Sequence, residues 1–124
     1  MSESKKIVIL EDDLALVTSL SRALESDGFE IYSAVDGETG LRTIAEKKPD
    51  LVILDIILPR KSGFEVMEAL SADKELSKIP VMVLTNLESS QDVNRMMELG
   101  AKSFLVKTNY SLDEVLVKVK GFFK

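Results

Sequence analysis

Five short apolar runs, separated by segments with helical periodicity, are the feature that most constrains the fold of this chain. The runs are Lys6 to Leu10, Phe29 to Ala34, Leu51 to Leu54, Val81 to Leu84 and Phe104 to Val106. Each has the length of a strand, and the segments between them carry apolar residues on one helical face. The pattern predicts strand and helix in alternation within one domain over residues 1–124, with a core from about residue 5 to residue 123.

Capping residues and breakers set the ends of the expected helices. They are Asp13 to Asp27, a segment with Leu41, Ile44 and Ala45 that Pro49 stops, a segment after Gly63 with Val66, Met67 and Leu70, a segment with Val93, Met96 and Met97 before Gly100, and a segment from Ser111. The last helix has a capping-box pattern, because Glu114 follows Ser111 by three residues. These signals support helix rather than strand between the apolar runs.

The expected fold is an α/β fold with a doubly wound parallel sheet. The first, third and fourth runs are apolar throughout, as strands are when helices cover both faces of a sheet. The second run, from Phe29 to Ser33, alternates instead and is expected at an edge. In the flavodoxin-like order 2-1-3-4-5, the first and third strands lie side by side, and a ligand binds where they end.

Acidic residues follow those two strands. Glu11, Asp12 and Asp13 come after the first run, and Asp55 comes after the third. Carboxylates that face one crevice repel each other by several kcal/mol unless a cation or a shared proton relieves them, and hard oxygen ligands suit Mg²⁺. A metal held in this way keeps positions open for phosphate oxygens, so Asp55 is the candidate nucleophile for a phosphoryl group.

Two further residues end the remaining strands at the same edge. Thr85 follows the fourth apolar run and Lys107 follows the fifth. A hydroxyl and an amine are the groups that a phosphorylated carboxylate needs as hydrogen-bond and charge partners. The ends of the strands therefore combine into one candidate phosphoryl site.

Composition excludes several other classes of function. The chain has no Cys and no His, which removes disulfides, the usual zinc ligands and imidazole chemistry. A net charge of −5 and the lack of a basic cluster argue against direct binding of nucleic acid. The apolar runs are far shorter than the roughly 20 residues of a membrane span. The polar start, Met1 to Lys6, lacks the apolar stretch of a secretory signal, so we expect a cytoplasmic location.

The chain resembles the receiver domain of bacterial two-component response regulators over essentially its full length. The resemblance is carried by Ile7 to Asp13, Leu51 to Pro59 with Gly63, Val81 to Thr85, and Gly100-Ala101 with Phe104 to Lys107. It implies the strand order 2-1-3-4-5. It also implies a phospho-accepting protein in a phosphorelay, rather than a metabolic enzyme: such a domain catalyses only its own phosphorylation and dephosphorylation.

The resemblance assigns roles around the nucleophile. Asp55 would accept a phosphoryl group from the histidine of a sensor kinase or a phosphotransfer protein. Mg²⁺ would be held by Glu11, Asp12, Asp55 and the backbone carbonyl of Ile57. Lys107 would neutralise the phosphoryl oxygens.

The resemblance also implies a switch. Thr85 would rotate toward the phosphoryl group, and Phe104 would turn inward into the vacated space. The face formed by the fourth helix, the fifth strand and the fifth helix would then bind a downstream protein effector. We expect a monomer or a weak, phosphorylation-dependent homodimer, with no membrane contact.

Three positions depart from the family pattern. Thr108 stands where the family has a proline in a cis bond, which predicts a trans bond and an altered loop from Lys107 to Tyr110. Asn86 follows Thr85 where a small residue is common, so it would crowd the phosphoryl group or hydrogen-bond to it. Ile57 is apolar and cannot assist an attacking water, which predicts a long-lived aspartyl phosphate.

Alternative interpretations remain for several of these features. Asp13 is expected to cap the first helix, and Phe104 is as readily a core residue as a switch. Met96 is expected in the core and Met97 on the helix surface. A phosphorylation-independent pseudo-receiver would keep the fold without the chemistry. A flavodoxin-like cofactor binder or a haloacid-dehalogenase-like phosphatase fits less well, because neither matches three successive acids after the first strand.

Overall fold

The computed structural model describes residues 4–123. The strands are β1 (Lys6–Leu10), β2 (Glu30–Ala34), β3 (Leu51–Leu54), β4 (Val81–Thr85) and β5 (Ser103–Val106). The helices are α1 (Leu14–Ser26), α2 (Gly37–Lys47), α3 (Gly63–Ala72), α4 (Ser90–Glu98) and α5 (Leu112–Gly121), with 3-10 turns at Leu76–Lys78 and Lys107–Asn109. The predicted domain limits at residues 1 and 124, and the start of the chain at Met1 to Glu3, lie outside the described residues.

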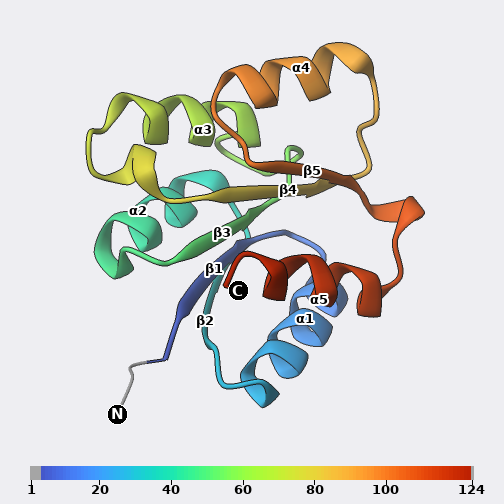
Figure 1. Cartoon of the computed structure of the whole chain (residues 1–124). Coiled ribbons are helices and arrows are strands. Elements are labelled where there is room, and N and C mark those ends of the chain that lie inside the picture. Colours follow the sequence, from blue (N-terminus) through green and yellow to red (C-terminus); the bar gives the residue numbers. More distant parts are fainter. Residues whose placement is uncertain (1–3, 124) are drawn as a thin grey trace.

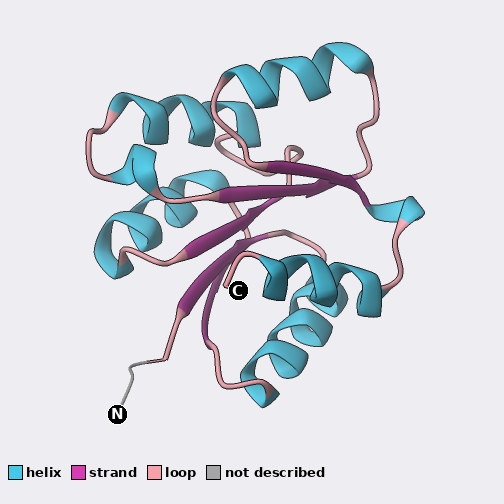
Figure 2. Cartoon of the chain, in the orientation of Figure 1, coloured by secondary structure: helices cyan, strands magenta, loops and turns pink. Residues whose placement is uncertain are grey.

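The strands form one parallel sheet in the order β2-β1-β3-β4-β5 (Figure 2). The predicted fold class and strand order are therefore confirmed. Helices α1 and α5 lie on one face of the sheet, and α2, α3 and α4 lie on the other (Figure 1). Strands β1, β3 and β4 are almost wholly buried, and β2 is an edge strand, as its alternating sequence predicted.

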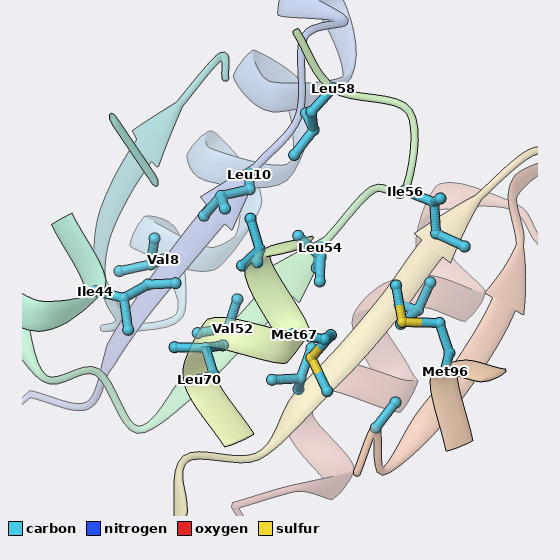
Figure 3. Close-up of a cluster of buried hydrophobic side chains, with 14 residues drawn as sticks. Val8, Leu10, Ile44, Val52, Leu54, Ile56, Leu58, Met67, Leu70 and Met96 are labelled. Carbon is cyan, nitrogen blue, oxygen red and sulfur yellow. The ribbon is translucent and has the colours of Figure 1, made fainter. Parts of the chain in front are cut away.

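Each face of the sheet has its own hydrophobic core. The side chains of Val8, Val52 and Leu54 point toward α2, α3 and α4, where they meet Ile44, Leu70 and other apolar residues (Figure 3). Their strand neighbours point the other way and pack against α1 and α5. This division follows from the two-residue period of a strand and explains the continuous apolar sequence of the central runs.

Several predicted element ends shift slightly. Strand β2 begins at Glu30 rather than at Phe29, whose ring instead packs against Phe123 with the centroids 5.0 Å apart. Strand β4 includes Thr85, and β5 begins at Ser103. The Phe29 N–H donates to the Leu24 carbonyl at 3.1 Å, which ties Phe29 to the end of α1. Thr85 pairs with Val106 and Ser103 pairs with Met82, so β4 and β5 extend to these residues.

The predicted caps are present. Asp13 accepts hydrogen bonds from the backbone N–H groups of Ala15 and Leu16 at the start of α1. Ser111 and Glu114 form the reciprocal capping box of α5. A side-chain oxygen in each case accepts from an N–H that has no partner inside the helix. Helix positions are therefore fixed at the carboxyl edge of the sheet, where the acidic residues lie.

Candidate functional site

The register of the sheet places Glu11 beside Asp55. Leu10 of β1 pairs with Leu54 of β3, so the residues that follow them leave the sheet at the same level. The Asp55 N–H donates to the Leu10 carbonyl at 3.0 Å, which extends the pairing by one step. The two acids are thus brought together by the strand register although they lie far apart in the sequence.

Glu11, Asp12 and Asp55 form a compact carboxylate cluster. One oxygen from each lies within 4.8 Å of the others. Glu11 is 3% exposed and Asp55 is 6% exposed, whereas Asp12 is exposed to solvent. Repulsion between charges at this spacing is strong where burial lowers the dielectric constant. The cluster therefore favours a bound cation.

Lys107, the residue directly after β5, supplies one such positive charge. Its Nζ lies 2.6 Å from Oε1 of Glu11 and 2.9 Å from Oδ2 of Asp55. Partial burial favours the neutral amine, but the hydrogen bonds to Glu11 and Asp55 outweigh it and raise the pKa of Lys107 above its ordinary value. Lys107 is therefore a stable ammonium that bridges two carboxylates.

The buried position of Glu11 is unfavourable for a negative charge. Burial raises its pKa from 4.5 to about 7, against the opposing effect of hydrogen bonds from Lys107 and from the backbone N–H of Asp13. The charge of nearby Asp55 raises the pKa further. The raised pKa means that the Glu11 carboxyl tends to keep its proton. A metal ion that took the place of this proton would bind a carboxylate that Lys107 and the Asp13 N–H already orient.

The loop after β3 folds closely around Asp55. The Ile57 N–H donates to Oδ1 of Asp55 at 3.4 Å, and the Gly63 N–H donates to the Ile56 carbonyl at 2.7 Å. A Cβ at Gly63 would lie 2.6 Å from the Asp55 carbonyl oxygen and from Cα of Ile56. Glycine is needed there because the start of α3 touches the backbone that carries Asp55.

The predicted switch residues lie outside the carboxylate cluster. Thr85 is fully buried at the end of β4, and its Oγ1 accepts a hydrogen bond from the Leu87 N–H at 3.4 Å. Phe104 is half-buried and packs against the core beneath α2, α3 and α4. Within residues 4–123, no hydrogen bond joins Thr85 to Glu11, Asp12 or Asp55. The structure thus brings together the acids and Lys107, and it leaves Thr85 and Phe104 in the adjoining core.

At the three positions that depart from the family pattern, two side chains are exposed and one peptide bond is trans. The Ile57 side chain is 59% exposed, and Asn86 is exposed. None of the described peptide bonds is cis, so the bond from Lys107 to Thr108 is trans, as predicted. The segment from Lys107 to Tyr110 contains the 3-10 turn Lys107–Asn109, which the sequence analysis did not predict.

The sequence did not reveal a small cavity beside Lys107. It has a volume of about 90 Å³ and is lined by Leu16, Leu84, Lys107, Tyr110, Leu112 and Val115. These residues come from α1, β4, α5 and the segment after β5. No spacing in the sequence signals such a cavity, because it arises only where the elements meet.

The donor set suits Mg²⁺. The cluster offers carboxylate oxygens on two strand ends, and the exposed Asp12 leaves a route for solvent and ligand. Mg²⁺ prefers such hard oxygens and retains several waters when one or two carboxylates hold it. Glu11, Asp12 and Asp55 therefore fit the metal that the sequence predicts, and Ile57 lies in the loop directly after Asp55.

Most of the chain matches a known protein family. Residues 7–120 match the family model described as the response regulator receiver domain. The chain belongs to the response regulator receiver family. The predicted family is therefore confirmed, and this receiver domain is part of a two-component response regulator.

Curated relatives of the receiver domain are transcriptional regulators. It is 34% identical over 96% of its length to the DNA-binding dual master transcriptional regulator RpaA of Synechocystis. It is 35% identical over 98% of its length to the alkaline phosphatase synthesis transcriptional regulatory protein PhoP of Bacillus subtilis. The chain covers 49% of each of these relatives, about half of their length. One relative is named for DNA binding, so the absence of nucleic-acid contact stays a prediction.

Solved structures show the same architecture. The BeF3-activated receiver domain of Klebsiella pneumoniae RstA superposes with a TM-score of 0.85 at 29% identity, covering 96% of this chain and 98% of that one. A CheY-like receiver protein from Methanospirillum hungatei gives a TM-score of 0.87 at 28% identity, covering 96% and 93%. The phosphorylated cyanobacterial phytochrome response regulator RcpA gives 0.82 at 28% identity, covering 95% and 90%.

No helix in the described range, residues 4–123, has both the length and the apolar character required to cross a bilayer.

Proposed function

We propose that Asp55 of this receiver domain accepts a phosphoryl group from a histidine of a partner sensor kinase or phosphotransfer protein. The observation that carries the proposal is the position of the Asp55 carboxylate, which lies 2.9 Å from the Lys107 ammonium in a cluster with Glu11 and Asp12. A nucleophile, a fixed cation and candidate metal ligands thus meet at one point. Such a combination is what phosphoryl transfer to a carboxylate requires.

In this reaction a carboxylate oxygen of Asp55 attacks the phosphorus atom in line with the leaving group. A new O–P bond forms while the P–N bond to the partner histidine breaks. The electron pair of that bond stays on the ring nitrogen. Because the other ring nitrogen carries a proton, the histidine leaves as a neutral imidazole. The product is a mixed anhydride of Asp55 and phosphate.

The residues around Asp55 have separate tasks. Lys107 would pair with a phosphoryl oxygen, since its ammonium already contacts the carboxylate that becomes modified. Glu11, Asp12 and Asp55, with the Ile57 carbonyl, would hold Mg²⁺, which supplies positive charge against the phosphoryl oxygens when bound. Near-complete burial of Glu11 and Asp55 limits competition from water around these charges.

The charge added at Asp55 would change the conformation of residues outside the carboxylate cluster. A phosphoryl group brings roughly −1.5 to −2 charges and new acceptor oxygens. Thr85 would turn its hydroxyl from the Leu87 N–H toward an oxygen of that group, and Phe104 would move into the space beside it. The α4-β5-α5 face would then favour a protein effector or a second copy of the chain. This is the work of a switch that catalyses only its own modification, not of a metabolic enzyme.

Phosphoramidate with Mg²⁺ provides a direct test by intact mass spectrometry. We expect the wild-type chain to gain one phosphoryl group and the Asp55→Asn variant to gain none. The same gain in the variant would place the phosphate elsewhere and overturn the assignment. A wild-type chain that gains nothing while retaining its fold would instead favour a pseudo-receiver.

A further inference from the structure

The cavity between α1 and α5 borders the stem of Lys107. Its walls are the side chains of Leu16, Leu84, Tyr110, Leu112 and Val115, together with Lys107 itself. Lys107 therefore runs from an apolar cavity at one end to Glu11 and Asp55 at the other. A lysine stem has four flexible bonds, so something must restrict it for the ammonium to be held in one place.

Tyr110 is placed to provide that restriction. It follows the 3-10 turn Lys107–Asn109, and its N–H donates to the Lys107 carbonyl at 3.4 Å. The 3-10 turn ends at Tyr110, where the backbone is extended, and the Tyr110 side chain meets the Lys107 stem at the cavity. Both line the cavity, and the half-buried ring also packs against the core beneath α1 and α5.

Lys107 is the first residue of this turn, and its bond to Thr108 is trans. The family pattern has a proline at that position, which would set the path of the backbone by its own ring. Here Thr108 takes the place of that ring, and Tyr110 packs directly after the turn. Within residues 4–123, the Tyr110 side chain hydrogen-bonds to none of the acidic residues.

We propose that Tyr110 is a positioning residue for Lys107: its ring closes the cavity beside the lysine stem and so holds the ammonium against Glu11 and Asp55. Without the Tyr110 ring, the cavity would be larger, and the Lys107 stem would be free to fold into the added space. The consequence for phosphoryl transfer rests on the proposed function, but the effect on the lysine does not.

Mg²⁺ binding measured by calorimetry tests this proposal without any phosphoryl transfer. The Lys107 ammonium occupies oxygens of Glu11 and Asp55 that the metal would use, so Lys107→Met should bind Mg²⁺ several-fold more tightly. Tyr110→Ala should shift the affinity in the same direction by a smaller factor. In the Lys107→Met background, Tyr110→Ala should change the affinity no further, and Tyr110→Phe should match wild type in both backgrounds.

A purely structural role for Tyr110 would give a different result. Loss of packing alone would weaken Mg²⁺ binding by the same factor with and without Lys107, and that outcome would overturn the proposal. Leu116→Ala is the matched control, because Leu116 is a half-buried residue of the same core that does not line the cavity. It should lower the melting temperature and leave the affinity for Mg²⁺ unchanged.

The Mg²⁺ affinities of the two single variants and the double variant form one double-mutant cycle. A second cycle, on the stability of the metal-free protein, tests whether Tyr110 and Lys107 also act together without Mg²⁺. In EDTA, the stability losses from Lys107→Met and Tyr110→Ala should sum to more than the loss in the double variant. Strict additivity would show that the two side chains do not act together. Acetyl phosphate should label Tyr110→Ala more slowly than wild type, with the rate restored in Tyr110→Phe. If wild type takes no label, the proposed function fails while both cycles still decide the role of Tyr110.

Discussion

The Lys107 ammonium lies 2.6 Å from Oε1 of Glu11, so the lysine holds the same buried carboxylate that would ligate a metal. The two cations therefore compete for one set of oxygens. Repulsion between unit charges about 4 Å apart is worth about 1 kcal/mol even in bulk water. We expect Lys107→Met to raise the affinity for Mg²⁺ by roughly fivefold or more, measured by calorimetry at constant ionic strength.

The same substitution should impair phosphorylation. Lys107 is the cation that contacts Asp55, and the phosphoryl product would lose its charge partner. Labelling by acetyl phosphate at saturating Mg²⁺ should slow by about tenfold or more. A Lys107→Met variant that binds Mg²⁺ no better and accepts phosphate at the wild-type rate would show that Lys107 does not act at this site.

The pKa of Glu11 predicts how stability depends on pH. Burial raises this pKa to about 7 in the folded protein, above the value of 4.5 for an unperturbed carboxyl. The folded state therefore binds the proton more tightly than the unfolded state does. This contribution to stability is fully present below pH 4.5 and is lost as the pH rises through about 7. The free energy of unfolding in EDTA should fall across that window, and Glu11→Gln should flatten the slope.

Saturating Mg²⁺ is the control for this pH dependence. A bound cation favours the ionised carboxylate, so the loss of stability above pH 4.5 should shrink or reverse in wild type. Glu11→Gln lacks the titrating group and should show a smaller change on metal addition. Equal slopes for wild type and Glu11→Gln in EDTA would contradict the prediction.

The fold was predictable because its main determinants are local. Continuous apolar runs identified the central strands, the alternating sequence of β2 identified an edge, and Asp13 was recognisable as a cap. Once parallel strands were inferred, their carboxyl ends had to share one edge of the sheet. The neighbouring positions of β1 and β3, which bring Asp55 close to the acids after β1, followed from the flavodoxin-like strand order that the resemblance implies.

The unpredicted features depend on contacts between distant segments. The Phe29 ring packs on Phe123 from the other end of the chain, and the cavity beside Lys107 needs side chains from several elements. The capping box of Ser62 and Glu65 at α3 is a different case, because its three-residue spacing is a local signal that the sequence itself contains. Local signals can be read in advance, whereas voids and aromatic contacts follow only from the packed structure.

Two glycines provide a matched test of the close packing behind Asp55. A methyl group at Gly63 would lie 2.6 Å from backbone atoms of Asp55 and Ile56, which cannot move without displacing the site. Gly63→Ala should cost about 1 to 3 kcal/mol of stability, as overpacking commonly does. It should also weaken Mg²⁺ binding. Urea denaturation and calorimetry would measure the two effects.

The comparison variant is Gly121→Ala at the end of α5. Nothing lies within 4 Å of a Cβ at this position, and its helical backbone suits alanine. Stability should stay the same or rise by up to about 1 kcal/mol, with no change in metal affinity. If Gly63→Ala behaved like Gly121→Ala, the backbone of Asp55 would have more freedom than the structure shows.

Ile57 determines the last prediction, the lifetime of the phosphorylated state. Its side chain is 59% exposed two residues beyond Asp55, and it offers no group that could orient a water molecule for attack on phosphorus. The aspartyl phosphate should therefore persist. Ile57→Gln places an amide at the same position, and a positioned polar group of this kind accelerates hydrolysis. We expect loss of label to speed up by roughly tenfold.

The control substitution is Ile57→Leu, which keeps the apolar character and the size of the side chain. Its half-life should match that of wild type, since neither residue can hydrogen-bond to water. The decay would be followed by intact mass after removal of the phosphodonor, with Mg²⁺ present throughout. Equal half-lives for Ile57→Gln and Ile57→Leu, or rapid loss of label from wild type, would mean that hydrolysis is controlled by another part of the site. Exposed Asn86, directly after Thr85, would then be the next side chain to replace.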